Sequence, residues 1–164
     1  MDIEKIYNDY FKIVYRYILS LSRDPELSED ITHDTFLKAL KRVEELGDDD
    51  NVQAWLCRIA RNDFYKRYNR KQRHVEIINS QHEEPTYESG PEAELVSRDE
   101  RVKLHQLLHS LEDPYKEVFS LRTFGDLTFK EIGQVFGKTE NWARVTYHRA
   151  RRKLMEAMDY ENKL

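Results

Sequence analysis

The stretch over residues 126–154 constrains the fold more than any other part of the chain, because it carries the start and stop signals of two short helices joined by a tight turn. Thr128 and Glu131 have the spacing of a capping box, so a helix is predicted to begin directly after the threonine. Gly137 can end that helix in the left-handed conformation, which costs glycine little, and Thr139 can cap the next helix. These signals together predict a helix-turn-helix.

The second of these helices separates its residues onto two faces. One face recurs every three or four residues and can pack on the first helix: Ala143, Tyr147, Ala150 and Leu154. The opposite side is too basic to bury and carries Asn141, Arg144, Val145, His148 and Arg152, flanked by Arg149 and Arg151. Arginine can bind guanine bidentately and asparagine can bind adenine when such a helix enters the major groove. DNA binding is therefore favoured over a merely solvated charged helix, which is the usual explanation of a charge run.

Composition predicts an all-α fold. The chain has 164 residues, of which only 5 are glycine and 4 are proline, and it shows no β-branched alternation. This length allows one ordinary domain or two small ones. The net charge of −4 would argue against a nucleic-acid binder, but the basic residues are concentrated in two segments with the acidic residues between and before them. The average charge therefore hides two positive patches.

The sequence offers no chemistry typical of an enzyme, so we expect no catalytic residue, metal or cofactor. It contains no glycine-rich phosphate loop or nucleophile elbow, and His105 and His109 have no further plausible metal ligand nearby. The single cysteine, Cys57, excludes an internal disulfide and is expected in the core. The N-terminal segment carries early acids and no uninterrupted apolar stretch, which predicts a cytoplasmic protein without a signal peptide or membrane insertion.

Two helices are predicted at the start of the chain. Apolar and aromatic residues repeat at helical spacing over residues 3–18 and give one long amphipathic helix. Asp24 and Pro25 then restart the chain as a cap and a first helical residue. In the helix that follows, Phe36 and Leu37 are adjacent and cannot both point fully into one core. One of the two is therefore expected to meet a partner.

A third helix is predicted after an aspartate-rich loop that ends in Asn51, a plausible cap. Its buried face would carry Val52, Trp55, Leu56, Ile59, Ala60 and Phe64. Its other side interleaves basic residues with tyrosines: Arg58, Arg61, Asn62, Tyr65, Lys66, Arg67, Tyr68, Arg70, Lys71 and Arg73. This pattern suits single-stranded or distorted duplex DNA, because guanidinium groups follow phosphates and aromatic faces stack on exposed bases. Alternatively, Tyr65 and Tyr68 would merely cover a neighbouring helix.

Periodicity is lost over residues 74–96, where the chain is acidic and contains two prolines and a glycine. A flexible linker is therefore predicted there. Beyond it, leucines recur over residues 104–111 and predict a further helix. Asp113 and Pro114 start another helix, which Gly125 ends just before the helix-turn-helix.

The order of these parts carries a family resemblance. The motif E-D-x-x-x-(D/E)-x-F occurs over residues 29–36, and W-L-x-R-I-A-x-N occurs over residues 55–62. With the final helix-turn-helix, they make nearly the whole chain resemble a bacterial RNA polymerase sigma factor of the extracytoplasmic-function (ECF) group. The resemblance implies a sigma2-like helical bundle over residues 1–73 and a sigma4-like helix-turn-helix domain over residues 97–164. The acidic flexible linker over residues 74–96 would join these two small helical domains.

The resemblance also implies partners and sites. One helix would bind the β′ clamp helices of core RNA polymerase through Asp30, His33, Asp34, Phe36 and Lys38. The resemblance implies the β flap as a further polymerase contact. The third helix and the loop before it would read and melt the promoter element near minus ten, through Asn51, Trp55, Arg58, Arg61, Asn62, Tyr65, Lys66 and Tyr68. The last helix would read the element near minus thirty-five, through Lys130, Asn141, Trp142, Arg144, Val145, His148, Arg149 and Arg152. An anti-sigma factor is expected to control this activity in response to stress or an extracytoplasmic signal.

Two other classes of function stay open from the sequence. A stand-alone helix-turn-helix regulator would bind a two-fold symmetric site without polymerase, although no dimerisation helix is evident. An adaptor or inactive relative would bind polymerase without starting transcription. Trp142 departs from the family pattern early in the recognition helix and is bulky enough to alter docking or to contact DNA. The promoter sequence is therefore not predicted from relatives.

Overall fold

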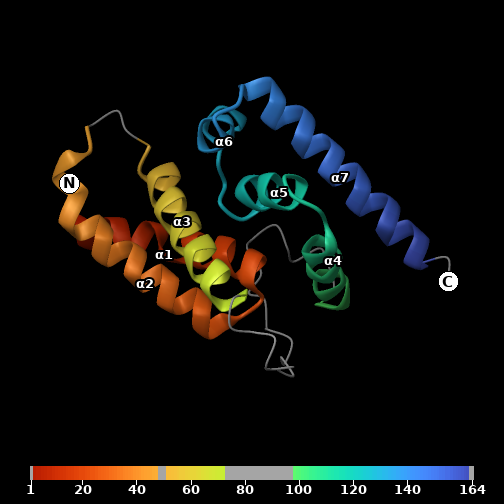
Figure 1. Ribbon diagram of the computed structural model, residues 1–164, viewed down its shortest axis with the longest axis horizontal. Coiled ribbons are helices and arrows are strands. Elements are labelled where there is room, and N and C mark those ends of the chain that lie inside the picture. Colours follow the sequence, from red (N-terminus) through yellow and green to blue (C-terminus); the bar gives the residue numbers. More distant parts are fainter. Residues whose placement is uncertain (1, 48–50, 73–97, 163–164) are drawn as a thin grey trace. The chain divides into compact units, whose positions relative to one another are not determined.

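A computed structural model describes residues 2–47, 51–72 and 98–162 of the chain (Figure 1). Within these residues all regular structure is helical, so the all-α class predicted from composition is confirmed. The chain divides into two compact units, Met1–Pro85 and Thr86–Leu164. Arg73 and the predicted linker over residues 74–96 lie outside the described residues.

The first unit is built from α1 (Ile3–Ser22), α2 (Pro25–Arg42), the short 3-10 turn η1 (Val43–Glu45) and α3 (Val52–Gln72). Each of the three α-helices packs against the other two, as Figure 1 shows. The restart predicted after α1 is confirmed, because the Asp24 side chain accepts a hydrogen bond from the Leu27 backbone N–H at 3.1 Å and Pro25 is the first residue of α2.

The core of the first unit comes from all three helices. Its fully buried side chains are Val14, Tyr17 and Ile18 from α1, Ile31 and Ala39 from α2, and Leu56, Cys57 and Ala60 from α3. The prediction that Cys57 is a small core residue is confirmed. Burying each large apolar side chain stabilises the bundle by about 1.5–3 kcal/mol. This shared core fixes the outward faces of α2 and α3 relative to each other.

The second unit is organised around one long helix. It contains α4 (Arg98–Ser110), α5 (Tyr115–Thr123), α6 (Phe129–Phe136) and α7 (Glu140–Asn162), and α7 contacts each of the other three. Its core cluster joins residues of α4, α5 and α7: Leu108, Phe119, Ala150 and Leu154. The inner face of α7 is thereby fixed, and its opposite face is left for other contacts.

The turn between α6 and α7 has the caps that the sequence predicts. The Thr128 hydroxyl accepts from the Glu131 N–H at 3.2 Å and donates to the Glu131 carboxylate at 2.8 Å. Gly137 is left-handed, with φ 65°, and the Lys138 N–H donates to the Gly133 carbonyl at 2.8 Å, which is the 6→1 bond of a Schellman motif. Thr139 accepts from the backbone N–H of residue 142 at 3.0 Å and so caps α7.

Gly133 is a structural requirement that sequence reasoning missed. A Cβ atom at this position would lie 2.8 Å from the carbonyl oxygens of Lys138 and Thr139, and both are backbone atoms. The start of α7 therefore lies against the backbone of α6, and only glycine allows this approach. Gly133 sets the distance between the two helices of the helix-turn-helix, while Gly137 sets the turn.

Candidate nucleic-acid interface

The two faces predicted for α7 are separated in the structure. Ala143 and Ala150 are fully buried, and the more distal Leu154 is nearly so. Thr146 is buried as well, which the spacing did not predict. The opposite side, which we call the reading face, is exposed and consists of Asn141, Arg144, Val145, His148, Arg149 and Arg152. A major groove can therefore be met by side chains that are not needed for the core of the unit.

The remaining two residues predicted to read the same element lie differently. Lys130 is exposed on α6. Trp142 is half-buried, and its ring centroid lies 5.3 Å from that of Phe136 at the end of α6. The tryptophan that departs from the family pattern therefore also packs across the turn, so its bulk is partly accommodated inside the unit.

The outward side of α3 presents cations and aromatic rings. Arg58, Asn62 and Lys66 are exposed, whereas Arg61 is half-buried, with its guanidinium 5.1 Å from the centroid of the Tyr65 ring. A guanidinium at this distance from a ring is attracted by the ring's quadrupole. The structure therefore brings the predicted cations and tyrosines of α3 together on one side of the helix.

The aromatic residues of α3 rest on Phe64. The Tyr68 ring stacks on Phe64 at 5.8 Å and is 45% exposed, and the half-buried Tyr65 meets Phe64 edge-on at 5.1 Å. Trp55 is half-buried, and Asn51 has a structural role because its side chain accepts the Ala54 N–H at 2.9 Å and so caps α3. Of these rings, that of Tyr68 is the most exposed.

The outward face of α2 is mixed in character. Asp30, His33 and Lys38 are exposed, and Asp34 is half-buried. Leu37 and Leu40 stand exposed on the same side by helical spacing. We call the surface formed by these residues the α2 face. Its apolar component was not included among the residues predicted to bind polymerase.

Phe36 lies beneath the α2 face rather than on it. Its ring is 5% exposed and contacts the rings of Tyr7 at 5.1 Å and Phe11 at 5.9 Å, both on α1. Leu37 is 58% exposed, so the prediction that the two neighbours cannot share one core is confirmed. Packing the Phe36 ring against the aromatic side chains of α1 removes its apolar surface from water. The neighbouring Leu37 then points outward. Phe36 therefore contributes to the face by supporting it from below.

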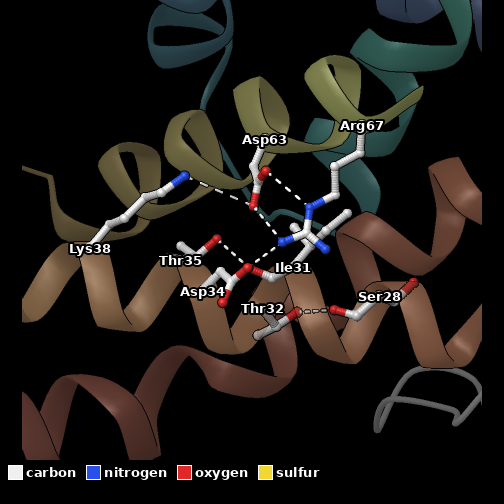
Figure 2. Close-up of polar contacts among 8 residues, drawn as sticks. All are labelled: Ser28, Ile31, Thr32, Asp34, Thr35, Lys38, Asp63 and Arg67. Atoms are coloured by element: carbon white, nitrogen blue, oxygen red, sulfur yellow. Dashed lines mark hydrogen bonds and ion pairs between the residues drawn. The ribbon is translucent and has the colours of Figure 1, made fainter. Parts of the chain in front are cut away.

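A charge network joins α2 to α3 (Figure 2). Asp63 of α3 is buried, and its carboxylate accepts a hydrogen bond from the Arg67 Nε at 3.1 Å. The Arg67 guanidinium reaches on to the Asp34 carboxylate of α2, while the Lys38 ammonium lies 3.9 Å from Asp63. A buried carboxylate would be costly if it were unpaired, and here two cations neutralise it.

Arg67 therefore has a different environment from the other cations of α3. Burial lowers the pKa of its guanidinium, but the hydrogen bond and charge of Asp63, with those of Asp34, outweigh burial and raise the pKa above its ordinary value. The group is charged throughout the physiological pH range. The i,i+4 spacing of Asp63 and Arg67 was the sequence signal for this pair, but it did not reveal that the pair is shared with α2.

Neither a potential metal cluster nor a membrane-spanning helix occurs in the described segments. Among residues 2–47, 51–72 and 98–162, no three side chains of His, Cys, Asp or Glu gather as a potential metal site. His105 is buried and stacks on Phe124 at 5.1 Å, whereas His109 is exposed. Among the helices of the described segments, none has the length and apolar character needed to cross a bilayer.

Comparison with known proteins places both units in one family. Sigma-70 region 2 matches residues 6–74, and Sigma-70, region 4 matches residues 101–154. The RNA polymerase sigma factor YlaC of Bacillus subtilis (strain 168) is 30% identical over 158 residues, covering 95% of this chain and 91% of the relative. The ECF RNA polymerase sigma factor SigM of the same strain is 28% identical over 158 residues, covering 94% and 93%.

Solved structures show the same fold. The sigma factor RpoE of Bartonella quintana, in complex with the anti-sigma factor NepR, has a TM-score of 0.77 at 20% identity and covers 95% of this chain and 96% of that one. CnrH, in complex with the cytosolic domain of CnrY, has a TM-score of 0.69 at 20% identity, covering 96% and 88%. From these matches we conclude that the chain belongs to the extracytoplasmic-function group of RNA polymerase sigma factors, non-enzymatic proteins that bind core RNA polymerase and direct transcription initiation from specific promoters.

Proposed function

We propose that three surfaces of this sigma factor bind three different partners or promoter elements. The α2 face binds the β′ clamp helices of core polymerase, the outward side of α3 reads and opens the promoter near minus ten, and the reading face of α7 reads the element near minus thirty-five. The observation that carries this proposal is the geometry of α7, whose cations are exposed along one side while its opposite side is buried in the core. Such a helix can enter a major groove without disturbing its own unit.

The minus-ten assignment rests on the combination of cations with an open ring. Lys66 and Arg58 are exposed on α3, and Tyr68 offers a stackable face that Phe64 supports from behind. Cations bind the phosphates of either duplex or single strands, but a supported aromatic face gains most from a base that has left the duplex. This combination favours a role for α3 in strand opening.

The polymerase assignment rests on the mixed chemistry of the α2 face. The exposed Leu37 and Leu40 would gain nothing from DNA phosphates, and the carboxylate of Asp30 would be repelled by them. Exposed apolar side chains bordered by charges of both signs are typical of a protein-binding surface. This face is therefore better suited to a protein than to nucleic acid.

The regulatory partner is proposed on the same grounds. An anti-sigma factor that covers the α2 face would block polymerase, and RpoE of Bartonella quintana is bound to an anti-sigma factor in its solved structure. We place this protein in the cytoplasm, where core polymerase and promoters are, with its release from the anti-sigma factor prompted by stress or an extracytoplasmic signal. Co-purification of the chain from cells tests this, and recovery without any inhibitory protein before induction would contradict it.

The direct test is run-off transcription with core polymerase on candidate promoters, with and without this protein. Initiation is expected only when it is present. Arg144→Ala should weaken the free energy of promoter recognition by about 1–3 kcal/mol if the guanidinium reads a base, and transcription should fall accordingly. Binding to core polymerase should be unchanged. Lys153→Ala is the matched control, because it removes one positive charge from α7 where the ammonium lies over Tyr115, 5.1 Å from its ring centroid. Initiation that never depends on the protein would refute the assignment, and tight binding to a two-fold symmetric site without polymerase would favour a stand-alone regulator.

A further inference from the structure

One aromatic ring underlies the start of the reading face. Phe129 is the first residue of α6, and its half-buried ring lies 5.4 Å from the Arg144 guanidinium and 6.2 Å from the His148 ring. Two side chains of the reading face therefore contact a residue of the preceding helix. The guanidinium of Arg122, from α5, lies at 4.6 Å from the same ring.

The ring is itself held in place. Phe129 follows the capping threonine of α6 and packs against Tyr147 of α7 at 5.5 Å. Tyr147 in turn stacks almost parallel on the core residue Phe119, with 5.7 Å between centroids and 14° between planes. The position of Phe129 is therefore determined by the core of the unit.

Arg144 is held from two directions. Its Nη2 donates to the Glu140 carboxylate at 3.2 Å, while the ring of Phe129 lies on another side of the guanidinium. A guanidinium has five N–H donors, so the bond to Glu140 leaves others available for a base. Arg122 is fixed by donation to the Leu127 carbonyl at 2.9 Å, and it adds a second positive charge at the same ring. Two cations beside one ring attract a phosphate as well as a base.

We propose that Phe129 is a positioning residue for promoter reading, whose ring holds Arg144 and His148 in a common orientation before DNA arrives. This inference rests on the proposed function of the reading face. An arginine side chain has a large rotamer entropy, and a bidentate contact with guanine requires its planar group in one orientation. When a protein orders such a group in advance, less conformational freedom is lost on binding. Phe129 then determines which bases are preferred, although its own ring need not touch DNA.

The competing explanation is that Phe129 only stabilises the junction of α6 and α7. A structural role would change the amount of folded protein and lower transcription from all promoters alike. A positioning role changes the preference for particular bases in the minus-thirty-five element. The test must therefore measure preference rather than total output.

The first experiment uses the full chain with core polymerase and a promoter library randomised in the minus-thirty-five element, with transcripts counted by sequencing. Phe129→Leu is expected to weaken preference by about two- to fivefold at the positions affected by Arg144→Ala, the range expected from loss of a cation–π contact. The double variant should add little at those positions, and Phe129→Tyr should keep the wild-type preference. Phe124→Leu is the matched control, because that ring stacks on His105 of α4, whereas the ring beside Arg144 and His148 is that of Phe129.

Two results would overturn the inference. In one, Phe129→Leu keeps the wild-type preference while Arg144→Ala loses it. In the other, Phe129→Leu lowers transcription from all promoters equally, and Phe124→Leu does the same at an equal loss of thermal stability. A wild-type protein with no preference at all in this element would instead refute the proposed function, so the two failures are distinguishable.

The second experiment uses the wild-type protein alone, without DNA and without any variant. In the NMR spectrum of the free full-length chain, the side-chain Nε–H of Arg144 is expected to be shifted by the ring and to be more ordered than that of Arg149, which is exposed on the same helix. If Arg144 is as mobile and as unshifted as Arg149, the ring does not orient it and the inference is wrong.

Discussion

The cations on the outward sides of α3 and α7 are held in different ways. On α7 the cations of the reading face are exposed, and the only carboxylate bonded to Arg144 in the described structure is that of Glu140, one helical turn earlier. On α3, Arg67 is drawn inward by the buried Asp63 and across to Asp34 of another helix. The turn at Gly133 thus adds to the core contacts that place α7, whereas the ionic link to α2 adds to the core contacts that place α3. Each prediction below tests one side of this comparison.

The largest effect is expected at the turn before α7. Gly133→Ala forces a Cβ atom against two backbone carbonyls, neither of which can rotate away, and should destabilise the second unit by about 3 kcal/mol, the upper end of the usual cost of overpacking. Urea unfolding followed by Trp142 fluorescence in a Trp55→Phe background measures this unit alone, since the chain has 2 tryptophans.

Gly137→Ala is the matched control for that substitution. A Cβ atom there would meet nothing within 4 Å, so only the left-handed backbone opposes it, at a cost of about 1–2 kcal/mol. Equal losses for the two variants would show that the backbone approach at Gly133 is not what fixes the helix-turn-helix.

A smaller effect is expected from the link between α2 and α3. Asp63→Ala should destabilise the first unit by about 2 kcal/mol, below the cost typical of breaking a buried pair, because Arg67 is partly exposed and keeps Asp34. Asp34→Ala should cost less than about 1 kcal/mol because that carboxylate is 44% exposed. Urea unfolding followed by Trp55 fluorescence, in a Trp142→Phe background, gives both values. A greater loss of stability for Asp34→Ala than for Asp63→Ala would show that Asp34, on α2, contributes more to the network than Asp63 does.

The next effect concerns strand opening by α3. Tyr68→Ala should weaken binding of the opened minus-ten strand by about 1–2 kcal/mol, while Tyr68→Phe should bind normally, because stacking needs the ring and not the hydroxyl. Permanganate footprinting of the polymerase complex measures the opened bases. Equal opening by all three proteins would show that Tyr68 only covers Phe64.

The smallest effect is expected from a single phosphate contact. Lys66→Ala should make the slope of log affinity against log salt shallower by about 0.7–0.9, the contribution of one phosphate on single- or double-stranded DNA, without changing base preference. Asn62→Ala, which removes an exposed neutral side chain of the same helix, should leave the slope unchanged. A salt series of promoter binding by the full holoenzyme decides between these results.

Local signals in the sequence predicted most of the helical architecture. Asp24, Thr128 and Thr139 act as caps where the sequence places them, and Gly137 adopts the left-handed turn that its position requires. Helical spacing also separated Ala143, Ala150 and Leu154 of α7 from its exposed residues, although it missed the buried Thr146. These features depend on neighbours within about one helical turn, so the sequence pattern is sufficient to predict them.

Features that depend on a second element could not be predicted in this way. The need for Gly133 arises from the backbone of the following turn, and the environment of Arg67 arises from Asp34 on another helix. Helical spacing could not predict which of Phe36 and Leu37 is buried, because the burial of Phe36 depends on its contacts with the rings of α1. The roles proposed for individual site residues remain predictions, since they depend on partners that bind from outside the chain.

The exposed side of α7 has a consequence for how such a protein can change. Asn141, Val145 and Arg149 lie outside the buried core of their unit, so substituting them should alter the preferred promoter while the fold is kept. Duplicated copies of one such gene could then diverge to serve separate sets of genes through a few codon changes. For engineering, the same property makes these positions the natural ones to randomise when an orthogonal promoter–sigma pair is wanted.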